Sequence, residues 1–161
     1  MFFLVLCAAL LTSCDRPPAQ APTLQVEQAD KELLEITQNA QRTLYIFFQH
    51  LNAPGAKEHD FYVKFPFSTD QSADADAEQV WLTGIRFKDG TYTGVLANEP
   101  AHIGGMSKGD TVVFGVDAIT DWMFVKDGKI AGGRSIRYLL EKTPENERTE
   151  SQRRLLQMFD D

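Results

Sequence analysis

Apolar positions near the start of the chain follow a helical period. Between about residues 28 and 51 they recur at spacings of three and four, which places them on one face, while charged and amide residues fill the other face. A proline and a glycine within 52–55 then end the pattern. We therefore expect a helix whose apolar face consists of Leu33, Ile36, Ala40, Leu44, Phe47, Phe48 and Leu51.

After residue 60 the pattern changes to the alternation of apolar and polar residues that is typical of β-strands. The predicted strands are 61–67, 79–88, 91–98, 111–116, 121–126 and 129–133. In the first of them, Pro66 cannot donate a ladder hydrogen bond, which predicts an edge strand or the end of a strand. In the second, the alternation slips at Gly84, which predicts a β-bulge or a close approach of another backbone.

Two Asp-Gly pairs, Asp89-Gly90 and Asp127-Gly128, separate neighbouring predicted strands. This dipeptide favours two-residue hairpin turns, because both central residues of such a turn have positive φ. The strands on either side of each pair are therefore expected to be antiparallel neighbours.

The chain ends in two short helical patterns. Their apolar faces consist of Ile136, Leu139 and Leu140 in the first, and of Leu155, Leu156 and Phe159 in the second. The last helix begins either at Thr143, with Pro144 at its first position, or at Thr149, with Gln152 completing a capping box. The order of elements predicts an α+β fold: an N-terminal helix, a curled antiparallel sheet or partial barrel of about five to six short strands, and C-terminal helices.

The first fourteen residues have the features of a lipoprotein signal. Residues 2–11 are apolar, a length of about ten residues that is typical of a signal-peptide core and shorter than the roughly 20 that span a bilayer. The segment 11–14, Leu-Thr-Ser-Cys, resembles the bacterial lipobox. The resemblance implies cleavage before Cys14 and lipid on its thiol, which would anchor the chain to a membrane. The alternatives are an ordinary secretory signal with an unrelated cysteine, and a buried apolar N-terminus.

A proline-containing tether follows the proposed lipid site. Residues 15–23 have no apolar period and are expected to be extended. Asp15 resembles the signal that retains lipoproteins in the inner membrane, which favours the periplasmic side of that membrane. The predicted organisation is a signal peptide at 1–13, a tether at 14–27 and one domain at 28–161.

Composition narrows the classes of partner. The 161 residues are 43% hydrophobic, which is enough for one domain with its own core. The net charge of −7 argues against nucleic acid as a partner, because phosphates would be repelled and no basic stripe offsets the acids. Both cysteines, Cys7 and Cys14, precede the domain, which therefore has neither a disulfide nor a cysteine-based metal site.

The segment 117–122 has two possible roles: a catalytic or ligand-binding site, or a purely structural element (scaffolding). Asp117 and Asp121 lie four residues apart beside Trp122, a set that suits acid–base catalysis or ligand stacking. Alternatively, Trp122 points into the core and Asp121 holds a turn through backbone N–H groups. We favour scaffolding, because a turn between the two acids would separate them and a catalytic carboxylate pair needs a defined spacing.

The sequence lacks the residue spacings of common catalytic and metal motifs. The histidines, His50, His59 and His102, are scattered and do not form an H-x-x-x-H or H-E-x-x-H pattern. No serine lies in a G-x-S-x-G or S-x-x-K motif, and no glycine-rich loop has the context of a phosphate-binding loop. We therefore predict no catalytic residue, no metal and no cofactor.

The long connection between the predicted strands 91–98 and 111–116 is the best candidate for a binding surface, since long loops in compact domains often have functional roles. The candidate binding surface consists of Asn98, Glu99, His102, Lys108 and Asp110, together with Asp121 and Trp122. A packed structural loop, with Asn98 and Pro100 setting a turn, is the alternative.

Several motifs between about 40 and 142 resemble those of the YegJ-like family of bacterial proteins, a domain family of unknown function. They are Lys64 in its strand, Glu78 to Trp81, Gly94 with Asn98 and Pro100, Gly109-Asp110, Asp121-Trp122 and Gly132-Gly133. The acidic loop 68–78 departs from the pattern. The resemblance implies a single domain with a core at about 40–142, and it implies no reaction.

Three hypotheses about function remain. The first is a non-enzymatic binding or structural module of the bacterial envelope, held by lipid on Cys14 and recognising an envelope protein or other component. The second is a hydrolytic or metal-assisted enzyme that uses Asp117 with Asp121, or His102. The third is an immunity-type inhibitor that acts through its acidic surface.

Overall fold

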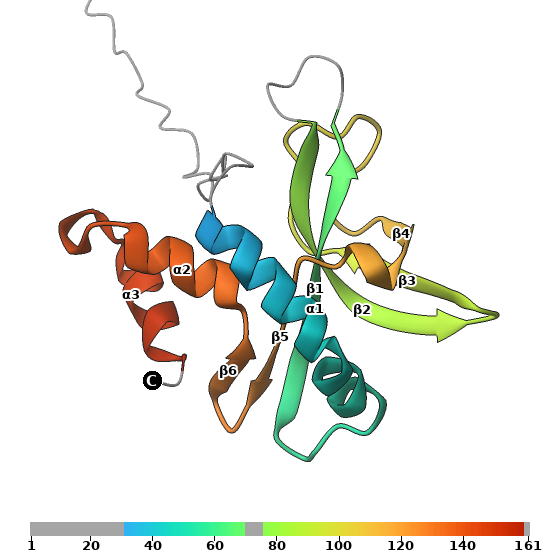
Figure 1. The fold of residues 1–161 in the computed structure, drawn as a ribbon, viewed down its shortest axis with the longest axis horizontal. Coiled ribbons are helices and arrows are strands. Elements are labelled where there is room, and N and C mark those ends of the chain that lie inside the picture. The colour runs from blue at the N-terminus through green and yellow to red at the C-terminus, as the bar shows by residue number, and fades with distance from the viewer. Residues whose placement is uncertain (1–30, 70–75, 160–161) are drawn as a thin grey trace, which may run out of the picture.

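A six-stranded antiparallel sheet with strand order β4-β3-β2-β1-β5-β6 lies at the centre of the computed structural model, which describes residues 31–69 and 76–159 (Figure 1). The helices are α1 (Lys31–Asn52), α2 (Arg134–Lys142) and α3 (Glu150–Gln157), with short 3-10 turns η1 (Val116–Ala118) and η2 (Glu145–Glu147). The strands are β1 (Glu58–Ser68), β2 (Ala77–Lys88), β3 (Thr91–Leu96), β4 (Thr111–Phe114), β5 (Asp121–Lys126) and β6 (Lys129–Gly132).

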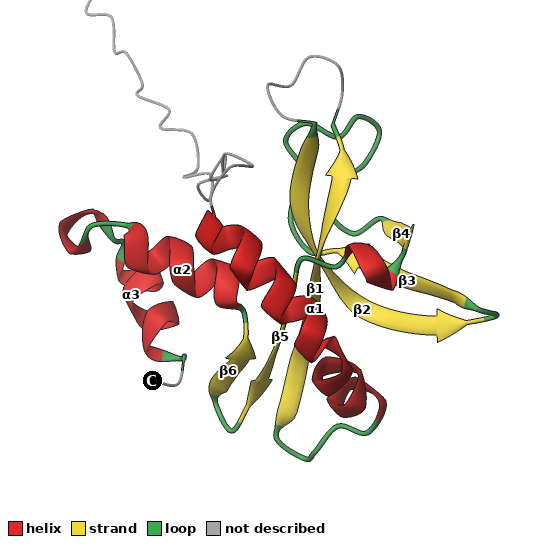
Figure 2. Cartoon of the chain, viewed as in Figure 1, coloured by secondary structure: helices red, strands yellow, loops and turns green. Residues whose placement is uncertain are grey.

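The predicted fold class is confirmed. One helix precedes the sheet and two follow it, and the sheet is curled but does not close into a barrel within the described residues (Figure 2). The predicted signal peptide, Cys14 and the tether lie outside the described residues. None of the described helices combines the length and the apolar character that crossing a membrane requires.

Helix α1 covers one face of the sheet through its predicted apolar side. Ala40 and Phe47 are fully buried there, and the indole N–H of Trp122 on β5 donates to the carbonyl oxygen of Ala40 at 3.1 Å. Burying a side chain such as Phe47 contributes about 2–3 kcal/mol. The contact with Trp122 therefore fixes α1 across β5 both by apolar packing and by a hydrogen bond.

Strand β5 is covered on both faces. Trp122 and Phe124 belong to the main core under α1, whereas Met123 and Val125 pack against a second cluster. This second cluster has Ile130, Leu140 and Phe159 as its buried residues, and it lies under α2 and α3. The period of two along a strand explains why neighbouring residues of β5 serve different cores.

The turn and bulge predictions are confirmed. Asp89 and Asp127 have φ of 52° and 49°, and the glycine after each is also at positive φ, as the mirror-image hairpin turn requires. Gly84 has φ of 58° and lies where the β2–β3 register shifts, so it forms a bulge.

The strand pairing answers the question about Pro66, and the helix caps answer the question of where the last helix begins. Strand β1 is central and not an edge strand, but its pairing with β5 ends at Lys64, so Pro66 lies where β5 is no longer a neighbour. Helix α3 begins at the capping box of Thr149 and Gln152, while Thr143 ends α2.

The two edges of the sheet differ. The end of the described chain lies beside strand β6: the N–H of Ile130 donates to the carbonyl of Met158 at 2.8 Å, and Phe159 forms an isolated bridge with Ile130. Strand β4, at the other edge, pairs with β3 alone among the described strands. Its Val113 side chain is 66% exposed.

We predict that Gly132→Ala destabilises the fold far more than Gly128→Ala. Both glycines have φ of +78°, so both substitutions place alanine in the left-handed region at a cost of about 1–2 kcal/mol. At Gly132 a Cβ would also overlap the carbonyl oxygen of Trp122, whereas nothing lies near it at Gly128. Denaturant unfolding should show a loss of about 3 kcal/mol or more for Gly132→Ala, and equal losses would contradict the close approach.

Candidate functional site

Asp121 is fully buried and caps a helix that lacks a capping residue of its own. The N-cap position of α2 is Gly133, which has no side chain to accept a hydrogen bond. Asp121 supplies the acceptor from β5: its Oδ2 accepts from the backbone N–H of Ser135 at 2.8 Å, and its Oδ1 accepts from that of Trp122 at 2.8 Å. The carboxylate thus binds the positive end of α2, where a negative charge is stabilising.

Lys64 lies directly across from Asp121 in the β1–β5 register and completes a buried polar cluster. Its Nζ donates to the hydroxyl oxygen of Ser135 at 3.2 Å and lies 5.7 Å from the centre of the Trp81 ring. Burial lowers the pKa of Lys64 and raises the pKa of Asp121. The attraction between the two charges, and the hydrogen bonds from Ser135 and Trp122 to Asp121, act against these shifts.

The types of side chain in this cluster are those of a lysine-activated serine nucleophile, but its geometry suits a structural role. Ser135 is only 5% exposed, so its hydroxyl has little access to a substrate carbonyl. The bond from Ser135 to Asp121 joins β5 to the start of α2, and the bond from Lys64 to Ser135 joins β1 to the same point. The cluster therefore acts as a joint between the sheet and the C-terminal helices.

Trp122 and Asp117 occupy different environments from each other. Trp122 is 3% exposed, and its indole N–H also approaches the Thr43 hydroxyl at 3.3 Å. Asp117 is exposed in η1, and its main-chain carbonyl accepts from the Gln41 side chain. The interpretation of this segment as scaffolding agrees with these positions, since one acid is buried and the other faces solvent.

A buried carboxylate orders the connection between β3 and β4. Glu78 on β2 is 7% exposed and accepts from the backbone N–H groups of Ala101 at 2.8 Å and His102 at 2.7 Å. Nearby, the side-chain oxygen of Asn98 accepts from the backbone N–H of Trp81 at 3.0 Å. Glu78 and Asn98 thus tie the connection to β2.

Two further acids brace the loop from within. Glu99 accepts from the backbone N–H of Lys108, and Asp110 accepts from that of Ser107, each at 2.9 Å. The side chains of His102 and Lys108 remain exposed. Five of the candidate surface residues, Asn98, Glu99, His102, Lys108 and Asp110, therefore share one ordered loop, whereas Asp121 and Trp122 lie in the interior.

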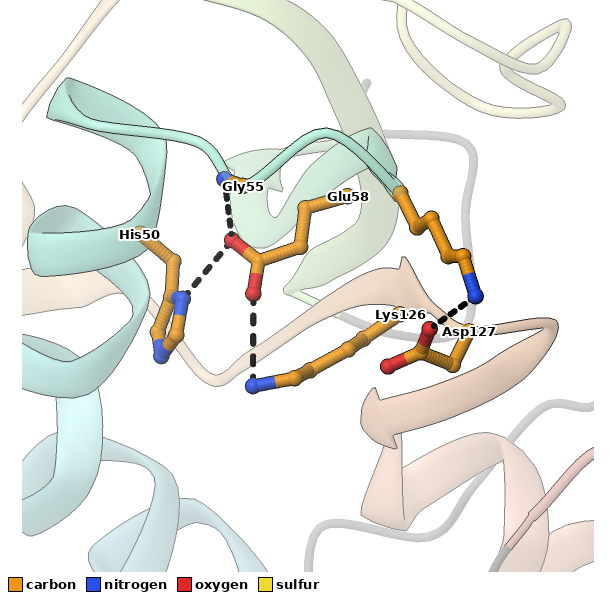
Figure 3. A network of polar contacts seen from close by, with 6 residues as sticks. His50, Gly55, Glu58, Lys126 and Asp127 are labelled. Atoms are coloured by element: carbon orange, nitrogen blue, oxygen red, sulfur yellow. Dashed lines mark hydrogen bonds and ion pairs between the residues drawn. The ribbon is translucent and has the colours of Figure 1, made fainter.

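A third polar cluster joins the end of α1 to β1 and β5, and it contains one of the histidines (Figure 3). Glu58 accepts from the Gly55 backbone N–H at 3.0 Å, contacts His50 Nδ1 at 2.8 Å and pairs with Lys126 at 3.4 Å. The other two histidines lie elsewhere: His59 contacts Asp60, and His102 is in the β3–β4 loop. In residues 31–69 and 76–159, no three His, Cys, Asp or Glu side chains gather as metal ligands would.

Comparison with known proteins places the sequence of this chain in a family. The family model described as "Uncharacterized protein conserved in bacteria (DUF2314)" matches residues 30–155. The chain belongs to the DUF2314 family. The predicted resemblance is confirmed, because "Uncharacterized protein YegJ" of Escherichia coli (strain K12) is 29% identical over 135 residues, which cover 83% of this chain and 84% of that protein.

A second relative of this DUF2314 chain is longer. It is "Putative ankyrin repeat protein NMB1133/NMB1171" of Neisseria meningitidis serogroup B (strain ATCC BAA-335 / MC58), 37% identical over 130 residues. The match covers 78% of this chain and 51% of the relative, so the chain spans about half the length of that protein. No solved structure matches the chain.

Sequence reasoning missed the contacts that Lys64, Ser135 and Glu78 make. Lys64 was visible as a charge within an otherwise apolar strand, and Glu78 as an acid at the start of another. Their partners lie 71 and 23–24 residues away in the chain. Only the pairing of strands and the position of α2 bring them together.

We predict that Asp121→Asn destabilises this DUF2314 domain by about 3–5 kcal/mol, because Lys64 then loses its buried counter-charge. Asp117→Asn is the matched control and should change the unfolding free energy by no more than about 0.5 kcal/mol. The double variant Lys64→Met/Asp121→Asn should recover part of the loss. If denaturant unfolding showed equally small changes in the unfolding free energy for Asp121→Asn and Asp117→Asn, the role of Asp121 as a joint between the sheet and α2 would be refuted.

We also predict a specific acid sensitivity from Glu58. Hydrogen bonds from Gly55 and His50, with a further one from Lys126, lower the pKa of Glu58 from 4.5 to about 2. Because the folded-state pKa is depressed, the stabilisation is complete above about pH 4.5 and is lost as the pH falls towards 2. Glu58→Gln should flatten the dependence of stability on pH in this window. Thermal unfolding at several pH values checks this, and parallel curves for both proteins would refute it.

Proposed function

We propose that this chain is a non-enzymatic binding module of the bacterial envelope, held on the periplasmic side of a membrane by lipid on Cys14. Its binding surface would be the β3–β4 loop, residues 98–110, together with the adjoining edge strand β4. The partner would be an envelope protein, and the Asp15 that follows Cys14 favours the inner membrane.

The observation that supports this proposal is the ordering of an exposed loop by a buried acid. Removing the Glu78 carboxylate from water is costly unless hydrogen bonds compensate, and its partners are the N–H groups of Ala101 and His102. The hydrogen bonds thus stabilise one conformation of the loop, while His102 and Lys108 face solvent. A preordered loop loses little conformational entropy on binding, which favours recognition.

Strand β4 adds an apolar element next to this polar loop. Val113 lies three residues beyond Asp110 and is 66% exposed. Along a strand, the backbone groups of successive residues point alternately towards one neighbour and the other. The N–H of Leu96 bonds to the carbonyl of Asp110, so Asp110 faces β3, and so do Val112 and Phe114. The backbone groups of Thr111 and Val113 therefore point away from β3, at the open edge. An extended segment of a partner would bond to those outward groups.

The arrangement of the acids and histidines also favours binding over catalysis. The buried Asp121, the Glu58–His50 pair and the loop residue His102 belong to three different places in the fold. Acid–base catalysis needs its groups within hydrogen-bond reach of one substrate. The Neisseria relative supports a modular domain, because the matching region there forms about half of a longer chain.

A single set of strains tests both parts of the proposal. A photo-cross-linking amino acid is placed at position 102 or 113 of the full chain in the bacterium that produces it, with positions 49 and 154 as exposed controls. We expect one protein adduct from 102 and 113 and none from the controls. Cys14→Ser should abolish both the adduct and labelling by a radioactive fatty acid. Equal adducts at all four positions would reject the surface, and labelling that persists in Cys14→Ser would reject the anchor.

A further inference from the structure

A hollow of about 550 Å³ lies beside α3, away from the β3–β4 loop. Its walls include Lys129 at the start of β6, Glu145 in η2, and Arg148 and Arg153, while Leu156 and Phe159 form an apolar part. The strand order places β6 and β4 at opposite edges of the sheet. In Figure 1, α3 accordingly lies on the β6 side, whereas the β3–β4 loop lies beside the ends of β1 and β2.

Arg148 is held in this hollow by the end of helix α2. Its Nε donates to the carbonyl of Thr143 at 2.8 Å and its Nη2 donates to that of Glu141 at 3.0 Å. Carbonyl groups at a helix C-terminus lack partners within the helix, so the guanidinium satisfies them. These bonds use two of the five N–H donors of the side chain and fix the position of its charge.

Arg153, on α3, is held in a similar way by the short turn η2. Its Nη2 donates to the carbonyl of Glu145 at 3.1 Å. The carbonyls that hold the two arginines belong to Thr143 and Glu145, which are two residues apart and so at most about 7 Å apart along the chain. Both arginines line the hollow.

The charge of these arginines is left without an anionic partner. Their bonds go to neutral carbonyl oxygens, and neither forms an ion pair with a carboxylate in the part of the chain that the structure describes. Nearby arginines behave differently: Arg137 pairs with Glu141, and Arg154 pairs with Glu150. Among the described residues that line the hollow, the charges of Arg148 and Arg153 thus meet one carboxylate, that of Glu145, on a chain whose net charge is −7.

We propose that this hollow binds a small organic anion, a carboxylate or phosphate that bears an apolar group. Guanidinium groups match the planar, two-oxygen geometry of such anions. The apolar group would lie on Leu156, which is half-buried, and on the small part of Phe159, 7%, that remains exposed. The volume lies within the range of small-molecule sites, about 300–1,000 Å³. The site is independent of the proposed binding loop, so either can fail without the other.

Titration of the full chain with phenyl phosphate and benzoate, followed by calorimetry or by amide NMR shifts, tests the proposal. Arg153→Gln should weaken binding of at least one of these anions by about tenfold, since a charge-assisted hydrogen bond is lost. The matched control is Arg154→Gln, which removes the same charge one residue further along α3, from a side chain that does not line the hollow. It should change the affinity by less than about twofold.

Three results would overturn the proposal. One is failure of both anions to bind the wild-type chain at millimolar concentration. Another is an equal loss in Arg153→Gln and Arg154→Gln, which would reflect general charge attraction. The third is binding of inorganic phosphate as tightly as phenyl phosphate, which would leave the apolar surface of Leu156 and Phe159 without a role.

Discussion

The fold depends on one buried carboxylate. Asp121 is fully buried, and it accepts hydrogen bonds from the start of α2 while it faces Lys64 across the β1–β5 pair. A charge in such a place is tolerated only when it is paired and hydrogen-bonded. The contact therefore specifies one position for α2 relative to the sheet, and with it the position of the second apolar cluster under α2 and α3. The cap that Gly133 lacks is supplied by a neighbouring strand.

Local patterns predicted the elements well. The apolar period of α1, the Asp-Gly turns and the capping box of Thr149 and Gln152 are all encoded within a few residues, so single-chain reasoning reached them. Long-range polar contacts were out of reach. The bond between Lys64 and Ser135 joins residues 71 positions apart, and nothing in either segment indicates the other. Pro66 likewise left open whether β1 is an edge strand or reaches its end there, because the answer depends on where the distant strand β5 pairs with β1.

The candidate surface was predicted in part by position and in part by residue type. The length of the connection indicates residues 98–110 as a candidate surface, and the five polar residues named there belong to one ordered loop. Asp121 and Trp122 were added for their chemistry, but they are buried, because a strand with both faces covered has no solvent side. Within the loop, three of the five polar groups bond to main-chain N–H groups. These three side chains fix the conformation of the loop, whereas His102 and Lys108 are exposed and available for contact with a partner.

The unequal edges of the sheet limit how copies of this chain can associate. At β6, the N–H of Ile130 is already bonded to Met158, so that edge offers little to an incoming strand. At β4, backbone groups remain open among the described residues. Growth of a continuous intermolecular sheet needs two open edges per molecule. Strand-to-strand association of two copies through the described residues would therefore end at a pair and would not extend into a filament.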